Sequence, residues 1–141
     1  MIVDAMTTVI FACVHNAGRS QMAAALFGAL ADPAKARAIS AGTQPADRVH
    51  PEVVEVMREL GVDLEQVRPQ RLTDAIAGGA GLLVTMGCGE VCPAVPGLRR
   101  LDWPLEDPKG KPPERVRAIR DEVRERVERL VAEHGWGRDA G

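Results

Sequence analysis

The residues best suited to chemistry lie together near the start of the chain, in the octapeptide CVHNAGRS at 13–20. Cys13 supplies a thiol, Arg19 a planar guanidinium fork and Ser20 a hydroxyl. A thiolate is a strong nucleophile, and an arginine fork can hold two oxygens of one anion. These residue types at this spacing therefore predict nucleophilic attack on the central atom of an oxyanion.

The octapeptide joins an apolar, β-branched run at 7–12, typical of a strand, to a segment rich in helix formers at 20–30. Backbone N–H groups in such a turn can converge on an anion, and the helix N-terminus adds positive potential, which also favours the thiolate of Cys13. A buried cysteine beside an unrelated surface arginine is the alternative interpretation. The predicted oxyanion-binding residues are Val14, His15, Asn16, Ala17, Gly18, Arg19 and Ser20.

Further strand and helix patterns alternate along the rest of the chain. Strands are predicted at 36–42, 81–87 and 99–103, and amphipathic helices at 50–60 and 112–135. This alternation predicts a single-domain α/β fold, with a parallel sheet of about four strands and helices on both faces. We expect one domain over residues 1–135, followed by a loose C-terminal tail at 136–141.

The ligand crevice of such a sheet lies beyond the carboxyl ends of its strands. There the sequence WPLEDPKG places Asp107 before a proline. A carboxyl group at this edge can protonate an oxygen that departs when Cys13 attacks, although Asp-Pro is also common in ordinary turns. Asp107 is our candidate general acid, and the adjacent Glu106 is the alternative.

Two more thiols, Cys88 and Cys92, directly follow the third strand pattern. In a helical turn these positions share one face with their Cα atoms roughly 6 Å apart, within disulfide range, so a redox relay is feasible. Zinc would normally need four ligands, and no second Cys/His pair stands at finger-like spacing. The three histidines, His15, His50 and His134, are scattered, so we predict no metal site.

The octapeptide CVHNAGRS resembles the active-site loop of the low-molecular-weight protein tyrosine phosphatase family, and more closely that of its arsenate reductase branch. Other segments occur in family-like order: SAGT, HPEVVEVMRELGVDL, LLVTMGC, CPAVPG and WPLEDPKGK. The resemblance implies that Cys13 is the nucleophile, that Arg19 binds the oxyanion, that Asn16 and Ser20 support the loop, and that Asp107 is the acid.

The same resemblance implies a thiol relay with arsenate as substrate. Cys13 would attack arsenate, Cys88 would attack Cys13 with release of arsenite, and Cys92 would attack Cys88. Which of the two late cysteines attacks first is open. The reductant would be thioredoxin, or a glutaredoxin-like protein working with a low-molecular-weight thiol. No metal or organic cofactor is expected. Some members of the branch bind potassium through an acidic residue on the first helix, where this chain has alanine at 23–25, and potassium binding stays open.

Composition limits the other function classes. The formal net charge is −2 without a basic stripe, so nucleic acid is not an expected partner. No segment reaches a membrane-spanning length, and we predict a cytoplasmic protein with no membrane partner. Two alternatives to a reductase stay open. One is a phosphatase, although the chain has no tyrosine to receive an aryl ester, and the other is a non-catalytic arsenite or metal sensor.

Overall fold

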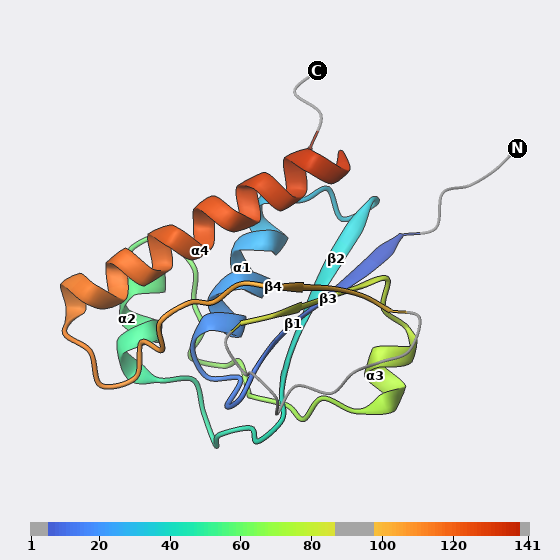
Figure 1. The fold of residues 1–141 in the computed structure, drawn as a ribbon. Helices are drawn as coiled ribbons and strands as arrows, with labels where there is room; N and C mark the ends of the chain where they lie inside the picture. Colours follow the sequence, from blue (N-terminus) through green and yellow to red (C-terminus); the bar gives the residue numbers. More distant parts are fainter. Residues whose placement is uncertain (1–5, 87–97, 139–141) are drawn as a thin grey trace, which may run out of the picture.

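A parallel sheet forms the centre of the computed structural model, which describes residues 6–86 and 98–138 (Figure 1). Within these residues the sheet has four strands in the order β2-β1-β3-β4. They are β1 (Thr7–Cys13), β2 (Ala36–Gly42), β3 (Leu82–Thr85) and β4 (Arg99–Asp102). All three neighbouring pairs are parallel, so the predicted sheet is confirmed.

The register of the sheet brings three carboxyl ends to one edge. Cys13, the last residue of β1, pairs with Gly42, the last residue of β2. On the other side of β1, Ala12 pairs with Thr85, the last residue of β3. The loop after β1 therefore starts between the ends of its two neighbours, at the edge where open α/β sheets bind ligands.

Helices cover both faces of the sheet (Figure 1). They are α1 (Arg19–Leu30), α2 (Pro51–Arg58), α3 (Asp74–Gly78) and α4 (Pro113–His134). Side chains of β1 alternate between the faces. Val9 and Phe11 pack in the larger core with α1, α2 and α4, whereas Ile10 packs with Ala77 of α3.

The long helix α4 follows its sequence pattern closely. Its predicted apolar stripe is buried: Val116, Ile119, Val123, Val127 and Leu130. On its exposed side, Glu122 lies 3.5 Å from Arg126, and Glu125 lies 2.7 Å from Arg129. The helix ends at His134 and is capped by Gly135, whose φ of 68° is left-handed and favours glycine. None of the helices in the described ranges is long and apolar enough to cross a membrane.

The structure differs from the sequence predictions at two places. Residues 74–78 form α3, which the sequence analysis did not predict because five residues are too few to show a helical period. The loose tail predicted from residue 136 is also wrong at its start. Trp136 stacks on His134, packs against Phe27 and accepts a hydrogen bond from the Asp32 backbone N–H. Its large apolar ring is buried more favourably than exposed.

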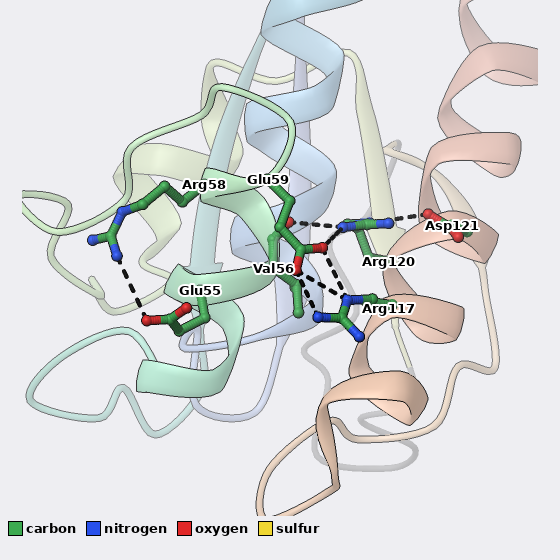
Figure 2. Close-up of polar contacts among 7 residues, drawn as sticks. All are labelled: Glu55, Val56, Arg58, Glu59, Arg117, Arg120 and Asp121. Atoms are coloured by element: carbon green, nitrogen blue, oxygen red, sulfur yellow. Dashed lines mark hydrogen bonds and ion pairs between the residues drawn. The ribbon is translucent and has the colours of Figure 1, made fainter.

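A polar cluster joins α2 to α4 (Figure 2). The carboxylate of Glu59, which directly follows α2, lies between Arg117 and Arg120 of α4. Arg120 is largely buried and also donates to the Val56 carbonyl oxygen at 2.8 Å and to Asp121 at 2.9 Å. Hydrogen bonds lower the pKa of Glu59 to about 2, and those from Arg117 have a larger effect than that from Arg120.

Candidate active site

The loop after β1 is held from outside by the segment that follows β2. The carbonyl oxygens of Val14, His15 and Ala17 accept hydrogen bonds of 2.8–2.9 Å from the backbone N–H groups of residues 44, 46 and 50, respectively. In a trans peptide the N–H points opposite to its C=O. The N–H groups of the residues following these carbonyls therefore point away from the 44–50 segment, which is the arrangement an anion-binding loop needs.

A hydrogen-bond chain ends at the Cys13 sulfur. Cys13 is only 3% exposed, and its Sγ lies 2.9 Å from Ser20 Oγ. Asn16 Nδ2 donates to the same Ser20 oxygen at 2.8 Å. Because that oxygen accepts from Asn16, its own proton is available to the sulfur. A hydroxyl donor at this distance stabilises a thiolate more than a thiol.

Asn16 is itself fixed by two glutamines that the sequence analysis did not single out. Its backbone is left-handed, with φ of 51°. Gln21 Nε2 donates to the Asn16 carbonyl oxygen at 3.0 Å and to Asn16 Oδ1 at 3.2 Å. The backbone N–H of Gln70 donates to the same Oδ1 at 2.9 Å. No local pattern marks Gln70, because it is 54 residues away in sequence.

Gly42 lets the loop lie directly against the end of β2. A Cβ built on Gly42 would be 2.6 Å from the Val14 carbonyl oxygen and 2.9 Å from the Asn16 nitrogen, both backbone atoms. The glycine of the SAGT segment is therefore part of the loop's support. The segment carried the family resemblance in the sequence, but only the contact explains why glycine stands there.

Arg19 connects the loop to the segment that carries the candidate acid. Its side chain is largely buried, and Nη1 donates to the Leu105 carbonyl oxygen at 2.9 Å. Its Nη2 lies 3.9 Å from the Asp107 carboxylate, whose side chain is 46% exposed. The structure thus brings Cys13, Arg19 and Asp107, which are separated by up to 94 positions, to one edge of the sheet.

Glu106 is adjacent to Asp107 but is engaged elsewhere. Its carboxylate accepts hydrogen bonds from Arg115 and lies 3.7 Å from Lys111. These hydrogen bonds lower the pKa of Glu106 below its ordinary value. Glu106 is thus engaged by Arg115 and Lys111, whereas Asp107 faces Arg19, and this placement favours Asp107 as the candidate acid.

The histidines have different surroundings. His134 is the last residue of α4, and its Nδ1 lies within hydrogen-bond distance of the Leu130 carbonyl oxygen, at 3.0 Å. His50 directly precedes α2. Its pKa is lowered because the effect of burial exceeds the opposite effect of the negative charges on Glu52 and Asp107. Within residues 6–86 and 98–138, no group of three His, Cys, Asp or Glu side chains could hold a metal ion.

Cys88 and Cys92 lie outside the described residues, so their predicted pairing stays a prediction. The last described residue before them is Met86, which lies next to the oxyanion loop. The Met86 backbone N–H donates to the Ala12 carbonyl oxygen at 2.9 Å, beside the start of the oxyanion loop.

Comparison with known proteins agrees with this geometry. Residues 8–135 match the model of the low molecular weight phosphotyrosine protein phosphatase family. A glutaredoxin arsenate reductase of Synechocystis is 34% identical over 130 residues, covering 90% of this chain and 98% of that protein.

Two solved structures are also similar. A thioredoxin-dependent arsenate reductase of Corynebacterium glutamicum is 39% identical with a TM-score of 0.79; the match covers 94% of this chain and 63% of that one. An arsenate reductase of Archaeoglobus fulgidus is 33% identical with a TM-score of 0.75, covering 88% and 98%. The chain therefore belongs to the low molecular weight phosphotyrosine protein phosphatase family.

Proposed function

We propose that this protein is an arsenate reductase that uses Cys13 as its nucleophile. The observation that carries the proposal is the hydrogen-bond chain from Asn16 through Ser20 to the Cys13 sulfur, at the mouth of a loop whose Arg19 reaches Asp107. Phosphatase chemistry would use the same groups. The reductases among the similar proteins, and the two further thiols of the chain, favour reduction.

In the first step the Cys13 thiolate attacks the arsenic of arsenate, and a sulfur–arsenic bond forms. The guanidinium of Arg19 and the loop N–H groups balance the charge of the arsenate oxygens. An arsenic–oxygen bond breaks, and the departing oxygen takes a proton from Asp107 and leaves as water.

Reduction follows when Cys88 attacks the Cys13 sulfur. A disulfide forms, the sulfur–arsenic bond breaks, and its electron pair stays on arsenic, which leaves as arsenite. Cys92 then attacks Cys88, so that Cys13 is released and a Cys88–Cys92 disulfide remains. The opposite order, with Cys92 attacking Cys13, is the alternative that the test below distinguishes.

A protein dithiol regenerates the enzyme by reducing the final disulfide. Thioredoxin and a glutaredoxin-like protein with a low-molecular-weight thiol are the two candidates, and similar proteins are named for each. Three catalytic thiols must be kept reduced between turnovers, which is a reason to place the protein in the cytoplasm.

The test measures arsenite formation with a thioredoxin system and with a glutaredoxin system side by side. Wild-type protein should turn over many times with one of them, and Cys13→Ser should be inactive with both. In a single turnover without external thiol, Cys92→Ser should still release one arsenite and trap a Cys13–Cys88 disulfide. A Cys13–Cys92 bond in the mapped peptides of Cys88→Ser, together with arsenite release, would reverse the order.

A phosphatase would give a different pattern. It would hydrolyse a small aryl phosphate through Cys13 and Asp107 in many turnovers, and it would form no arsenite with either reductant. In a reductase, replacing either late cysteine with serine should stop multiple-turnover reduction and leave slow aryl phosphate hydrolysis.

A further inference from the structure

Besides the ion pairs of Glu106 and Asp107, three contacts attach the acid loop, residues 105–111, to its surroundings. Arg19 Nη1 holds its first carbonyl oxygen, that of Leu105. The Gly110 backbone N–H points to Glu52 Oε2 at 3.4 Å. Between these two attachments the ring of Pro108 lies against Gly18 of the oxyanion loop.

The contact at Gly18 leaves no room for a side chain. A Cβ built on Gly18 would be 2.9 Å from Pro108 Cγ and 3.4 Å from Pro108 Cδ. The same point is 3.5 Å from His50 Cδ2, and the His50 backbone N–H is bound to the Ala17 carbonyl oxygen. The obstacle is the Pro108 ring, which is stiff, whereas the distance to His50 is ordinary van der Waals contact.

The position of Pro108 bears directly on the acid. Asp107 is bonded to Pro108, and its Oδ1 accepts the Lys109 backbone N–H at 3.0 Å within the same turn. The turn is closed by the Lys111 N–H, which donates to the Pro108 carbonyl oxygen at 3.1 Å. A displacement of the Pro108 ring would therefore carry the Asp107 carboxyl group with it.

We propose that Gly18 is a positioning residue for proton transfer. Because Gly18 has no side chain, the Pro108 ring packs directly on its backbone. This contact, which we call the Pro108 seat, fixes where the Asp107 carboxyl group lies relative to the oxyanion loop. The proposal rests on the proposed function, in which Asp107 is the acid. It assigns to Gly18 a role in the protonation step in addition to the oxyanion contact predicted for its backbone N–H, which an alanine would keep.

Gly18→Ala is the direct test, and Gly28→Ala is its matched control. Gly28 lies in α1, and a Cβ there would meet nothing within 4 Å. In single turnovers Gly18→Ala should slow arsenite release by about tenfold to hundredfold, within the roughly 10²- to 10⁴-fold that a positioned acid contributes. Its dissociation constant for arsenate should stay within about threefold of wild type, since the loop and Arg19 remain. Gly28→Ala should match wild type both in the rate of arsenite release and in the dissociation constant for arsenate.

A double-mutant cycle separates a seat for Pro108 from a general disturbance of the loop. In a Pro108→Ala background the methyl group added at position 18 no longer meets the Pro108 ring, and its 3.5 Å distance to His50 Cδ2 is ordinary van der Waals contact. There Gly18→Ala should change the rate by no more than about twofold, whereas independent effects would multiply. An equal loss in both backgrounds would overturn the proposal, as would a loss of arsenate affinity that matches the loss of rate.

Two further measurements distinguish a failure of the Pro108 seat from a failure of the proposed function. The Gly18→Ala defect should be larger for phenyl phosphate than for 2,4-dinitrophenyl phosphate, whose leaving group needs little protonation. Hydrogen exchange of the peptide covering 104–111 should be faster in Gly18→Ala, whatever reaction the protein catalyses. Unchanged exchange and an unchanged leaving-group dependence would refute the seat, while failure of wild type to form arsenite would refute the function alone.

Discussion

At the level of single residues, two adjacent carboxyl groups in the acid loop are distinguished only by their neighbours. Arg115 and Lys111 hold Glu106 in its charged form, whereas Asp107 faces Arg19 at 3.9 Å beside the oxyanion loop. Proton transfer requires a donor within reach of the departing oxygen and with a proton to give. Asp107, which faces Arg19 beside the oxyanion loop, is therefore the candidate acid of the two.

Asp107→Asn should therefore slow arsenite formation in a single turnover by about 10²- to 10⁴-fold, because an amide keeps the shape but cannot deliver a proton. Arsenate affinity should change little. The matched variant Glu106→Gln should stay near the wild-type rate, although it loses the pairs with Arg115 and Lys111. Rapid-quench measurement of arsenite provides the check, and a larger defect in Glu106→Gln would move the acid to that residue.

Ser20 should control the reactivity of the nucleophile. Its hydroxyl lies 2.9 Å from the Cys13 sulfur, and a hydrogen bond to a charged group is worth about 1.5–3 kcal/mol. Ser20→Ala should slow alkylation of Cys13 by iodoacetamide at pH 7 by about tenfold or more. The rate can be followed by mass spectrometry of the Cys13 peptide.

Thr43→Ala is a suitable control for this experiment. Thr43 Oγ1 is buried and has no hydrogen-bond partner among the described residues, so its removal breaks no hydrogen bond to the loop. If both variants are alkylated at the wild-type rate, the hydroxyl of Ser20 does not activate the thiol.

At the level of elements, the cluster around Glu59 fixes the end of α2 against α4 (Figure 2). The folded-state pKa of Glu59 is about 2, below the ordinary 4.5. A carboxylate whose pKa is lowered by folding stabilises the folded state. This stabilisation is complete at pH values above the unfolded-state pKa, and it is lost as the pH falls through the folded-state pKa. The cluster should therefore stabilise the protein fully at neutral pH and progressively less from about pH 4.5 to pH 2.

Glu59→Gln should lower the urea midpoint of unfolding at pH 7, because the largely buried Arg120 loses an ionic partner. The difference from wild type should be clearly smaller at pH 3. Glu55→Gln is the control, since Glu55 meets the exposed Arg58 only at 3.6 Å and such pairs contribute about 0–1 kcal/mol. A pH-independent effect of Glu59→Gln would contradict the assigned pairing.

At the level of the whole molecule, the site is assembled from the loop after β1, the end of β2 and the acid loop after β4. A ligand that touches such distant segments binds the folded chain and not the unfolded one. Arsenate, or phosphate as an unreactive stand-in, should therefore stabilise the fold by about 2.7 kcal/mol at 100 times its dissociation constant.

This stabilisation should raise the melting temperature by several degrees, on the order of 5–10 °C, in a calorimetric scan. Arg19→Lys should abolish most of the rise, because an ammonium group cannot replace the bidentate fork. Chloride at equal ionic strength controls for screening. An equal rise with chloride, or an undiminished rise in Arg19→Lys, would mean that the anion does not bind in the loop.

Much of the fold was determined by the sequence itself, because it depends on local patterns. The β-branched run before Cys13, the strand at 36–42 and the apolar stripe of α4 lie where their periodicity predicted them. Side-chain alternation and the helical repeat are read within a few residues. The short α3 was missed because one helical turn capped by Thr73 carries no repeat.

The loop chemistry was likewise visible in the order of residues from Cys13 to Ser20. The tertiary structure decided what surrounds it: Gln70 on Asn16, Pro108 on Gly18, and Arg115 on Glu106 rather than on Asp107. Two of these pairs are more than fifty positions apart, and their contacts exist only once the parallel strands bring their carboxyl ends together. Sequence spacing identifies groups that can react, but distances between remote segments, fixed by packing, select which of them do.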